Sequence, residues 1–349
     1  MMLKSMENIV DSNGVSRISE IYNNKRYIIS NIGDVFWWEN ISSKKAEWKK
    51  LWFEVNDDWV LLSYHWNDED VEIPYGITAI WESAFADLKN LKSVKLPDSV
   101  ISIWDKAFFY CMNLSSVKLP NSLVSIWDDA FNCCFKLNSL NNPSSVNSVW
   151  VGAFHLCGFL NSIIIPEGVC SIWESTFRYC WKLNSINMPE SVTSIWDEAF
   201  YECKELLSLK LPNSLVSIWD EAFRHCMKLS SLELPDSLVS IWCWAFNECY
   251  NFTSIKIPNS VKTIWEETFA SCKNLTEIEI PNSVISIWDE AFYRCTGLSS
   301  IEIPNSVVSM WYWIFDSCKN LKEIKLPKRF KWQEDSFCID KNCQIVWID

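Results

Sequence analysis

The chain has 349 residues, 49% of them hydrophobic and 21% charged, which provides enough apolar material for one sizeable core or two modest ones. The formal net charge is -13, and no cluster of Lys or Arg offsets it, which argues against nucleic acid as a partner because such a body repels phosphate backbones. No apolar run reaches the length of a membrane-spanning helix, and the first residues, Met1 to Gly14, lack the apolar centre of a recognisable signal peptide.

Residues 1–50 contain no internal repeat. They combine polar runs with short apolar stretches such as Tyr27 to Ile29. We interpret them as an irregular N-terminal extension with one or two strands.

A repeat of 23 residues begins near residue 75 and continues to about residue 330. Phe follows the repeated Trp by four residues in every copy, Cys follows it by seven in ten copies, and all twelve prolines occupy one further column. The repeated tryptophans are Trp81, Trp104, Trp127, Trp150, Trp173, Trp196, Trp219, Trp242, Trp265, Trp288 and Trp311.

Two hydrophobic periods alternate within one unit. Leu298, Ile301 and Ile303 have the spacing of a short strand, and Pro304 ends it because proline has no N–H for the ladder. Residues 289–295 place Ala, Phe and Cys at three- and four-residue spacings, which predicts a short helical turn on the opposite wall. Because no unit can bury its apolar face alone, we predict a repeat solenoid with coils about 4.8 Å apart, a parallel β-sheet on one face and short helical turns or loops on the other.

Residues 331–349 lose the register of the repeat. Trp332 follows Trp311 by 21 residues, and Phe337 follows Trp332 by five instead of four. A terminal unit must present one face to water, so we expect a C-terminal cap here. The predicted organisation is an extension at 1–50, an N-terminal cap at 51–74, eleven units at 75–330 and an end cap at 331–349.

The repeat pattern L-x-x-I-x-I-P-x-S-V-x-S-I-W-x-x-A-F-x-x-C resembles the BspA-like leucine-rich repeat family over roughly residues 53–330. The resemblance implies a leucine-rich repeat fold, with the segment from Phe53 to Asp68 as the hairpin that starts the array. It also implies a non-enzymatic binding protein that recognises a protein or a glycan, with adhesion at a cell surface. The missing signal peptide favours instead a cytoplasmic structural or interaction scaffold, so both the cell-surface and the intracellular interpretations stay open.

The chain departs from the family pattern at its glycine positions. Trp stands there in all eleven repeats, and also at Trp59 and Trp66, although a tight turn after Asp58 favours Gly because the backbone must reach φ > 0. The chain has 22 Trp and 7 Gly, and their sum of 29 is about 8% of 349, close to the usual share of glycine. We therefore hypothesise an alternative genetic code, in which most of these codons are UGA, translated here as Trp and used by the organism for Gly. The alternative is a true ladder of stacked indoles.

Ten of the fifteen cysteines form the repeat column, at inward positions between Phe and Leu. We predict that they are free, buried thiols, because parallel side chains on neighbouring coils hold their Cβ atoms slightly too far apart for a disulfide. Outside the column, a disulfide between Cys338 and Cys343 within the end cap is the alternative to two free thiols.

No catalytic, cofactor or metal site is predicted. The 23-residue spacing never supplies the paired ligands of a zinc site, and no phosphate-binding glycine loop exists even if every Trp is replaced by Gly. His155 and His225 lie near column cysteines but have no orienting acid within their repeats. The residue after the repeated Trp is acidic in eight of eleven copies, which we assign to capping of the turn that it begins; calcium binding is the alternative.

The outward column of the predicted sheet is the candidate binding face, because solenoids use extended sheet faces for their partners. Its low content of aromatic residues and Arg indicates a solvated face or a weak partner. The candidate residues are Lys95, Lys118, Asn141, Asn187, Lys210, Glu233, Lys256, Glu279, Glu302 and Lys325.

Overall fold

The computed structural model describes residues 21–22, 25–26, 28–29, 35–36, 52–141 and 143–349. The chain divides into two compact units, Met1–Phe53 and Glu54–Asp349. In the first unit, β1 (Ile21–Tyr22) pairs antiparallel with β2 (Lys25–Arg26), and β3 (Ile28–Ile29) pairs antiparallel with β4 (Val35–Phe36). The rest of the predicted N-terminal extension lies outside the described residues.

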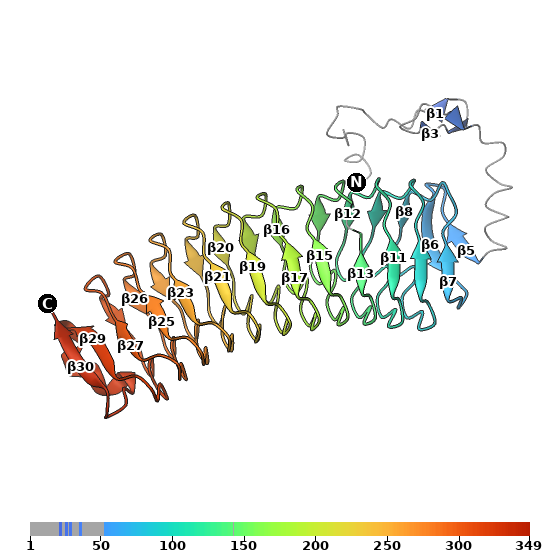
Figure 1. The fold of residues 1–349 in the computed structure, drawn as a ribbon. Coiled ribbons are helices and arrows are strands. Elements are labelled where there is room, and N and C mark those ends of the chain that lie inside the picture. The colour runs from blue at the N-terminus through green and yellow to red at the C-terminus, as the bar shows by residue number, and fades with distance from the viewer. Residues whose placement is uncertain (1–20, 23–24, 27, 30–34, 37–51, 142) are drawn as a thin grey trace. The chain divides into compact units, whose positions relative to one another are not determined.

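The second unit is a solenoid built from two rows of short parallel strands (Figure 1). The front row holds the strand that precedes each proline and, at its C-terminal end, one further strand. Its members are β7 (Asp70–Glu72), β9 (Ser93–Lys95), β11 (Ser116–Lys118), β13 (Ser139–Leu140), β15 (Ser162–Ile164), β17 (Ser185–Asn187), β19 (Ser208–Lys210), β21 (Ser231–Glu233), β23 (Ser254–Lys256), β25 (Glu277–Glu279), β27 (Ser300–Glu302), β29 (Glu323–Pro327) and β30 (Gln344–Ile348).

The second row holds the dipeptide before each repeated Trp and begins with a hairpin. Its members are β5 (Phe53–Val55), β6 (Val60–Tyr64), β8 (Ala79–Ile80), β10 (Ser102–Ile103), β12 (Ser125–Ile126), β14 (Ser148–Val149), β16 (Ser171–Ile172), β18 (Ser194–Ile195), β20 (Ser217–Ile218), β22 (Ser240–Ile241), β24 (Thr263–Ile264), β26 (Ser286–Ile287) and β28 (Ser309–Met310).

Where strands of neighbouring repeats pair, each residue pairs with the equivalent residue of the next coil. In the front row Ser208 pairs with Ser231 and Leu209 with Leu232, each 23 residues apart. In the second row, Ile195 pairs with Ile218 in the same way. The solenoid prediction, with a parallel sheet on one face, is confirmed.

Identical residues stack in the core as continuous columns. The rings of Phe200, Phe223 and Phe246 are fully buried and lie nearly parallel, with centroid separations of 5.2 and 5.5 Å. The column thiols are also buried, and each donates to the carbonyl oxygen of the Phe in the preceding coil, as Cys226 Sγ does to Phe200 O at 3.2 Å. All fifteen cysteines are free, including Cys338 and Cys343.

The wall between each repeated Trp and the column Cys, here called the turn wall, contains turns and no helix. In the coil from Trp104 to Cys111, Ala107 N donates to Trp104 O within the coil, whereas Lys106 N donates to Asp128 O of the next coil. Lys106 and Tyr110 have positive φ, of 56° and 62°. A positive φ interrupts a right-handed helix, so the predicted helical spacing is realised as successive β-turns whose third residue is left-handed.

The C-terminal end departs from the repeat. A 3₁₀ helix, η2 (Lys328–Phe337), buries Phe330 and Phe337, and β30 then pairs with β29 over five residues. The residues that break the 23-residue register therefore form the last turn of the solenoid.

Candidate binding surfaces of the solenoid

The candidate residues of the sequence stand in one column on the outward side of the front strands, which we call the front face. The pleat explains this placement, because alternate residues such as Leu209 point inward and are buried while Ser208 and Lys210 point outward. Nine of the ten candidates have exposed side chains, and the tenth, Lys325, is half-buried beside β30.

Ion pairs occupy the two ends of the front face. Lys95 Nζ lies 2.5 Å from Glu72 Oε1 near the N-terminal end, and Lys325 Nζ lies 2.9 Å from Glu302 Oε2 near the C-terminal end. These pairs join neighbouring coils across water-exposed positions, where solvent screens the charges, so their contribution to stability is small.

Asn141 has a structural role that the sequence does not reveal. Its Nδ2 donates to Leu119 O at 3.1 Å, and its Oδ1 accepts from Leu119 N at 3.2 Å. The side chain thus replaces ladder bonds at the end of β13, which has only two residues. Both polar atoms of the Asn141 side chain therefore make hydrogen bonds within the fold.

A hollow of about 640 Å³ lies on the front face over β25, β27 and β29. Glu277, Glu279, Glu302 and Glu323 contribute carboxylates to its lining, and Lys325 contributes the ammonium group that pairs with Glu302. Its volume lies in the range of ligand sites, and its lining is mostly anionic and polar. The hollow thus suits a cationic group.

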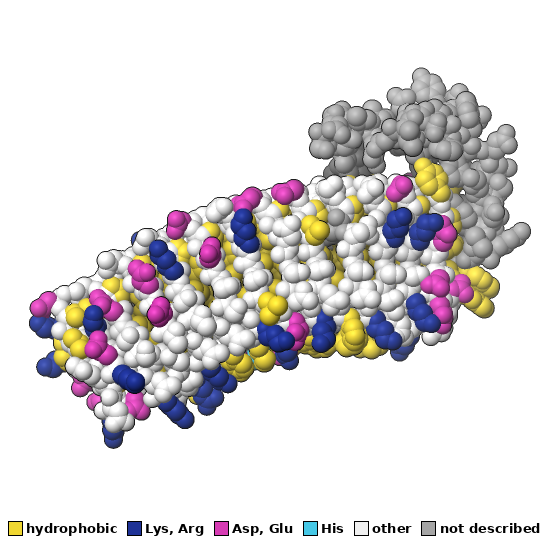
Figure 2. Space-filling model, viewed as in Figure 1, with side chains coloured by type: hydrophobic (Ala, Val, Ile, Leu, Met, Phe, Trp, Pro, Cys, Tyr) yellow, Lys and Arg dark blue, Asp and Glu magenta, His cyan; other side chains and the backbone are white. Residues whose placement is uncertain are grey.

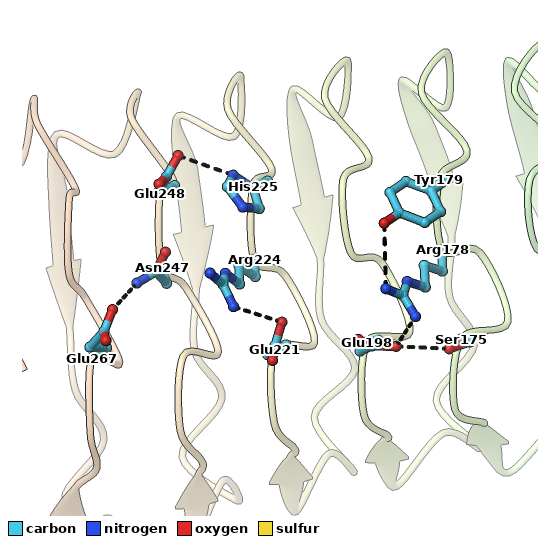
Figure 3. Close-up of polar contacts among 10 residues, drawn as sticks. All are labelled: Ser175, Arg178, Tyr179, Glu198, Glu221, Arg224, His225, Asn247, Glu248 and Glu267. Atoms are coloured by element: carbon cyan, nitrogen blue, oxygen red, sulfur yellow. Dashed lines mark hydrogen bonds and ion pairs between the residues drawn. The ribbon is translucent and has the colours of Figure 1, made fainter.

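The turn wall carries a ladder of aromatic and charged side chains that joins several coils (Figure 3). The guanidinium carbon of Arg178 lies 4.9 Å from the ring centroids of both Tyr179 and Tyr201, within cation–π range. Arg178 Nη1 also lies 2.5 Å from Glu198 Oε2, and Ser175 Oγ donates to the same oxygen at 3.2 Å. These contacts hold the guanidinium between two tyrosine rings and one carboxylate, while its buried Nε has no hydrogen-bond partner in the described part of the chain.

The ladder continues through the next coils. Arg224 Nη1 lies 2.9 Å from Glu221 Oε2, and His225 Nδ1 lies 3.0 Å from Glu248 Oε2 (Figure 3). Asn247 Nδ2 donates to Glu267 Oε2 at 2.7 Å. No acid within the repeat of His225 indicates this pairing. Glu248 occupies the same column in the next coil, 23 residues later, and that spacing is the signal that finds it.

The acidic column after the repeated Trp bonds across coils instead of capping its own turn. Asp220 Oδ1 accepts from Cys243 N at 3.0 Å, and Asp197 Oδ1 accepts from Asp220 N at 3.2 Å. Burial, and then the neighbouring Asp197 carboxylate, raise the pKa of Asp220. The prediction that these carboxylates accept backbone N–H groups is thus confirmed, but the N–H groups belong to the next coil and not to the same turn.

Acidic residues gather at the two positions that follow each repeated Trp, which we call the acidic edge. Over the eleven coils these positions hold thirteen carboxylates and one lysine, Lys106. The carboxylates are Glu82, Asp105, Asp128, Asp129, Glu174, Asp197, Glu198, Asp220, Glu221, Glu266, Glu267, Asp289 and Glu290.

Lysines gather on the loops that lead into the front strands. We call three positions in each of these loops the lysine edge. The first two are the residues that directly follow the column Cys, or Leu88 in the first coil. The third is the residue that directly follows the next buried Leu or Phe. These positions hold one acidic residue, Glu205, and nine lysines: Lys89, Lys92, Lys136, Lys182, Lys204, Lys228, Lys273, Lys319 and Lys322. In Figure 2 dark-blue side chains recur with yellow ones along the lower edge of the solenoid. Apart from two pairs at a spacing of three residues, Lys89 with Lys92 and Lys319 with Lys322, neighbouring members are 22 or more residues apart in the sequence, so the edge forms only when the chain is coiled.

Nothing in the described part of the chain assembles a nucleophile with a base or a metal with its ligands. His225 is half-buried on the turn wall beside Glu248, whereas Cys226 points into the core, where burial raises the pKa of its thiol. Burial, and then Arg178, lower the pKa of His155. Among these residues, no three His, Cys, Asp or Glu side chains are grouped to hold a metal ion. No helix in the same region has the length and apolarity to cross a bilayer.

Stacked 23-residue coils with a parallel front sheet define a leucine-rich repeat solenoid. Within this class, the model of the BspA type leucine rich repeat region matches residues 63–182, 170–272 and 240–348, and the chain belongs to this family.

Solved structures show the same fold. A leucine rich cell surface protein from Faecalibacterium prausnitzii is 23% identical, with 96% of each chain covered and a TM-score of 0.57. A leucine-rich repeat protein from Bacteroides ovatus is 24% identical, with 95% of this chain and 100% of that one covered and a TM-score of 0.56. None of the curated proteins matches this chain. At these identities the likeness concerns the fold.

Proposed function

We propose that the protein is a non-enzymatic recognition protein that acts at a cell surface and binds a partner protein through its front face. The hollow over β25, β27 and β29 carries this proposal, since it combines a volume of about 640 Å³ with four glutamates and one lysine. Its anionic lining suits a cationic segment of a partner, and opposite charges accelerate and orient such an encounter. The likeness to a cell surface protein of Faecalibacterium prausnitzii supports the location.

The location is tested on intact cells. Brief protease treatment of cells that express the protein is expected to remove it, while a cytoplasmic marker survives. Protection of the protein under these conditions would favour the alternative of an intracellular scaffold.

The binding face is tested with matched variants. Beads coated with the purified chain are expected to adhere to cells, and Glu279→Gln with Glu302→Gln is expected to weaken that adhesion because it removes two carboxylates from the hollow. Glu82→Gln with Glu174→Gln, on the acidic edge, removes the same charge elsewhere and is the control. Equal adhesion by both variants would place recognition outside the hollow. Adhesion that is inhibited by soluble glycan but not by protease treatment of the target cells would identify glycan recognition instead.

We also propose that most of the tryptophans are glycine in the protein made by its own organism. Trp59 in the N-terminal hairpin has φ of 62°. Trp244 and Trp313, with φ of 53° and 55°, occupy the column where Gly152 has φ of 60° and where the other eight coils hold polar residues of similar φ; none of the eleven repeated tryptophans has a positive φ. Glycine adopts such angles at little cost, whereas an indole side chain gains nothing there. The regular stacking of the repeated indoles, such as Trp196 on Trp219 at 4.8 Å, supports the alternative of a true ladder. A UGG codon at position 196 would refute the proposal, and UGA with glycine found there by peptide mass spectrometry would support it.

A further inference from the structure

The lysine edge is a basic strip on an acidic protein. Its positions hold nine lysines and one glutamate, while the chain as a whole has a net charge of -13. At physiological ionic strength charges interact over about 8 Å, so the acidic edge on another side of the coil does not cancel a field at the loops. The strip therefore attracts anions locally although the whole molecule is negative.

Six of these lysines make no ion pair with any residue in the described part of the chain: Lys89, Lys136, Lys182, Lys273, Lys319 and Lys322. The side chains of all six are exposed. The other three pair with acids, as Lys228 Nζ does with Glu205 Oε2 at 2.7 Å. The unpaired ammonium groups recur along the edge and lack a counter-charge from the protein.

Aromatic rings lie between the lysines on the same edge. Phe135 contacts Phe159 and Trp181 edge to face, at centroid separations of 5.3 and 5.6 Å, and the side chain of Phe159 is 46% exposed. Lys273 Nζ lies 3.9 Å from the ring centroid of Tyr250. The exposed ring of Phe159 offers a flat apolar surface on which the C–H face of a sugar ring can pack.

We propose that the lysine edge binds a linear acidic polysaccharide, one that carries carboxylate or sulfate groups on some of its sugars. Eleven coils spaced about 4.8 Å apart extend over roughly 53 Å, so six unpaired lysines give on average one positive charge per roughly 9 Å of the edge. That density suits a polymer with one charge on every one or two sugars, whereas duplex DNA carries one charge per about 1.7 Å of its axis. A single line of loops also suits a linear polymer better than the plane of a membrane. This binding goes beyond the proposed function, since it uses another surface and another ligand.

The experiment measures retention of the full chain on immobilised polygalacturonate and on immobilised dextran sulfate at 0.15 M salt, with neutral dextran as the blank. The wild-type chain is expected to bind both charged polymers and to dissociate as salt is raised. Lys136→Gln, Lys182→Gln and Lys273→Gln together are expected to weaken binding roughly tenfold, because three unpaired charges are lost.

The matched control removes three lysines from the front face: Lys118→Gln, Lys210→Gln and Lys256→Gln. It changes the net charge equally and is expected to leave retention within about twofold of wild type. Equal weakening by both triple variants would overturn the proposal, because it would show that the polysaccharide responds to the net charge of the protein and not to the lysine edge. So would tighter binding to single-stranded DNA or to phosphatidylserine vesicles than to either polysaccharide, or no retention at all. Bead adhesion by the lysine-edge variant separates the proposals, since the front-face proposal expects that adhesion to persist.

Discussion

Mildly alkaline solution is expected to unfold the solenoid through its ten column thiols. Burial raises the pKa of Cys111 and Cys318 to about 12, and it raises the pKa of the other eight well above the ordinary value of 9.0. A thiol with a raised pKa keeps its proton in the folded chain and loses it in the unfolded chain. Stability is therefore fully present below pH 9.0 and is lost as the pH rises toward the folded-state pKa.

The size of the effect follows from the unfolded-state ionisation alone while the folded thiols stay neutral. One thiol with an unfolded pKa of 9.0 lowers the unfolding free energy by about 0.4 kcal/mol at pH 9 and by about 1.4 kcal/mol at pH 10. Ten thiols together reach about 14 kcal/mol at pH 10, close to the upper end of the whole stability of a typical domain, about 5–15 kcal/mol.

The assay is the guanidinium midpoint of the circular dichroism signal at pH 8, 9 and 10, with a reductant present throughout. The midpoint is expected to fall steeply between pH 9 and pH 10. Cys203→Ala removes one buried thiol and should reduce the pH 8 to pH 10 loss by about 1.4 kcal/mol. Cys170→Ala, which removes an exposed thiol, is the matched control. A midpoint that stays constant from pH 8 to pH 10, or a Cys203→Ala variant with the wild-type pH dependence, would refute the reasoning.

Three further predictions concern the core and the turn wall. Phe223→Ala should lower the unfolding free energy by about 3–5 kcal/mol, measured by denaturant titration, whereas Phe159→Ala should change it little because that ring is 46% exposed. Burial and neighbouring carboxylates raise the pKa of Asp220 and Glu290 above their ordinary values of 3.8 and 4.5. Their contribution is present below those values and is lost as the pH rises through the raised pKa, so the thermal midpoint of wild type should fall less on acidification than that of Asp220→Asn with Glu290→Gln. Gly152→Ala should cost about 1–2 kcal/mol, because Gly152 has φ of 60°, and a thermal midpoint equal to wild type would contradict this.

The repeat made the solenoid predictable because equal spacing places equal residues in equal environments. Once Phe200 is assigned to the core, Phe223 and Phe246 must occupy the same place in the following coils, and their rings do stack. The strand before Pro304 was predictable for a local reason, since proline ends ladder pairing. Both inferences needed only one period of the sequence.

The turn wall was harder to predict because its backbone contradicts its local sequence. Each of the eleven coils has two positions of positive φ, and only Gly152 among them is glycine. Residues such as Glu198 and Glu221 give no sign of a left-handed conformation, so the three- and four-residue spacing of Ala, Phe and Cys predicted a helix. Inter-coil bonds such as Phe200 N to Ala222 O stabilise these turns, and those bonds exist only once the coils have stacked.

The two charged edges depend on the same stacking, and they explain why a like-charged column is tolerated. Burial, and then repulsion by the neighbouring Asp197 carboxylate, raise the pKa of Asp220 on the acidic edge. Asp220 is nevertheless stabilised there because its Oδ1 accepts the backbone N–H of Cys243, which the turn leaves without a partner inside its own coil. Among the described residues, the ammonium groups of Lys136 and Lys182 on the lysine edge make no corresponding bond to the backbone, and both side chains are exposed. A carboxylate that accepts a backbone hydrogen bond already stabilises the fold and needs no ligand. A row of charged side chains without such a bond is the better candidate for binding. This contrast favours the lysine edge over the acidic edge as a recognition surface.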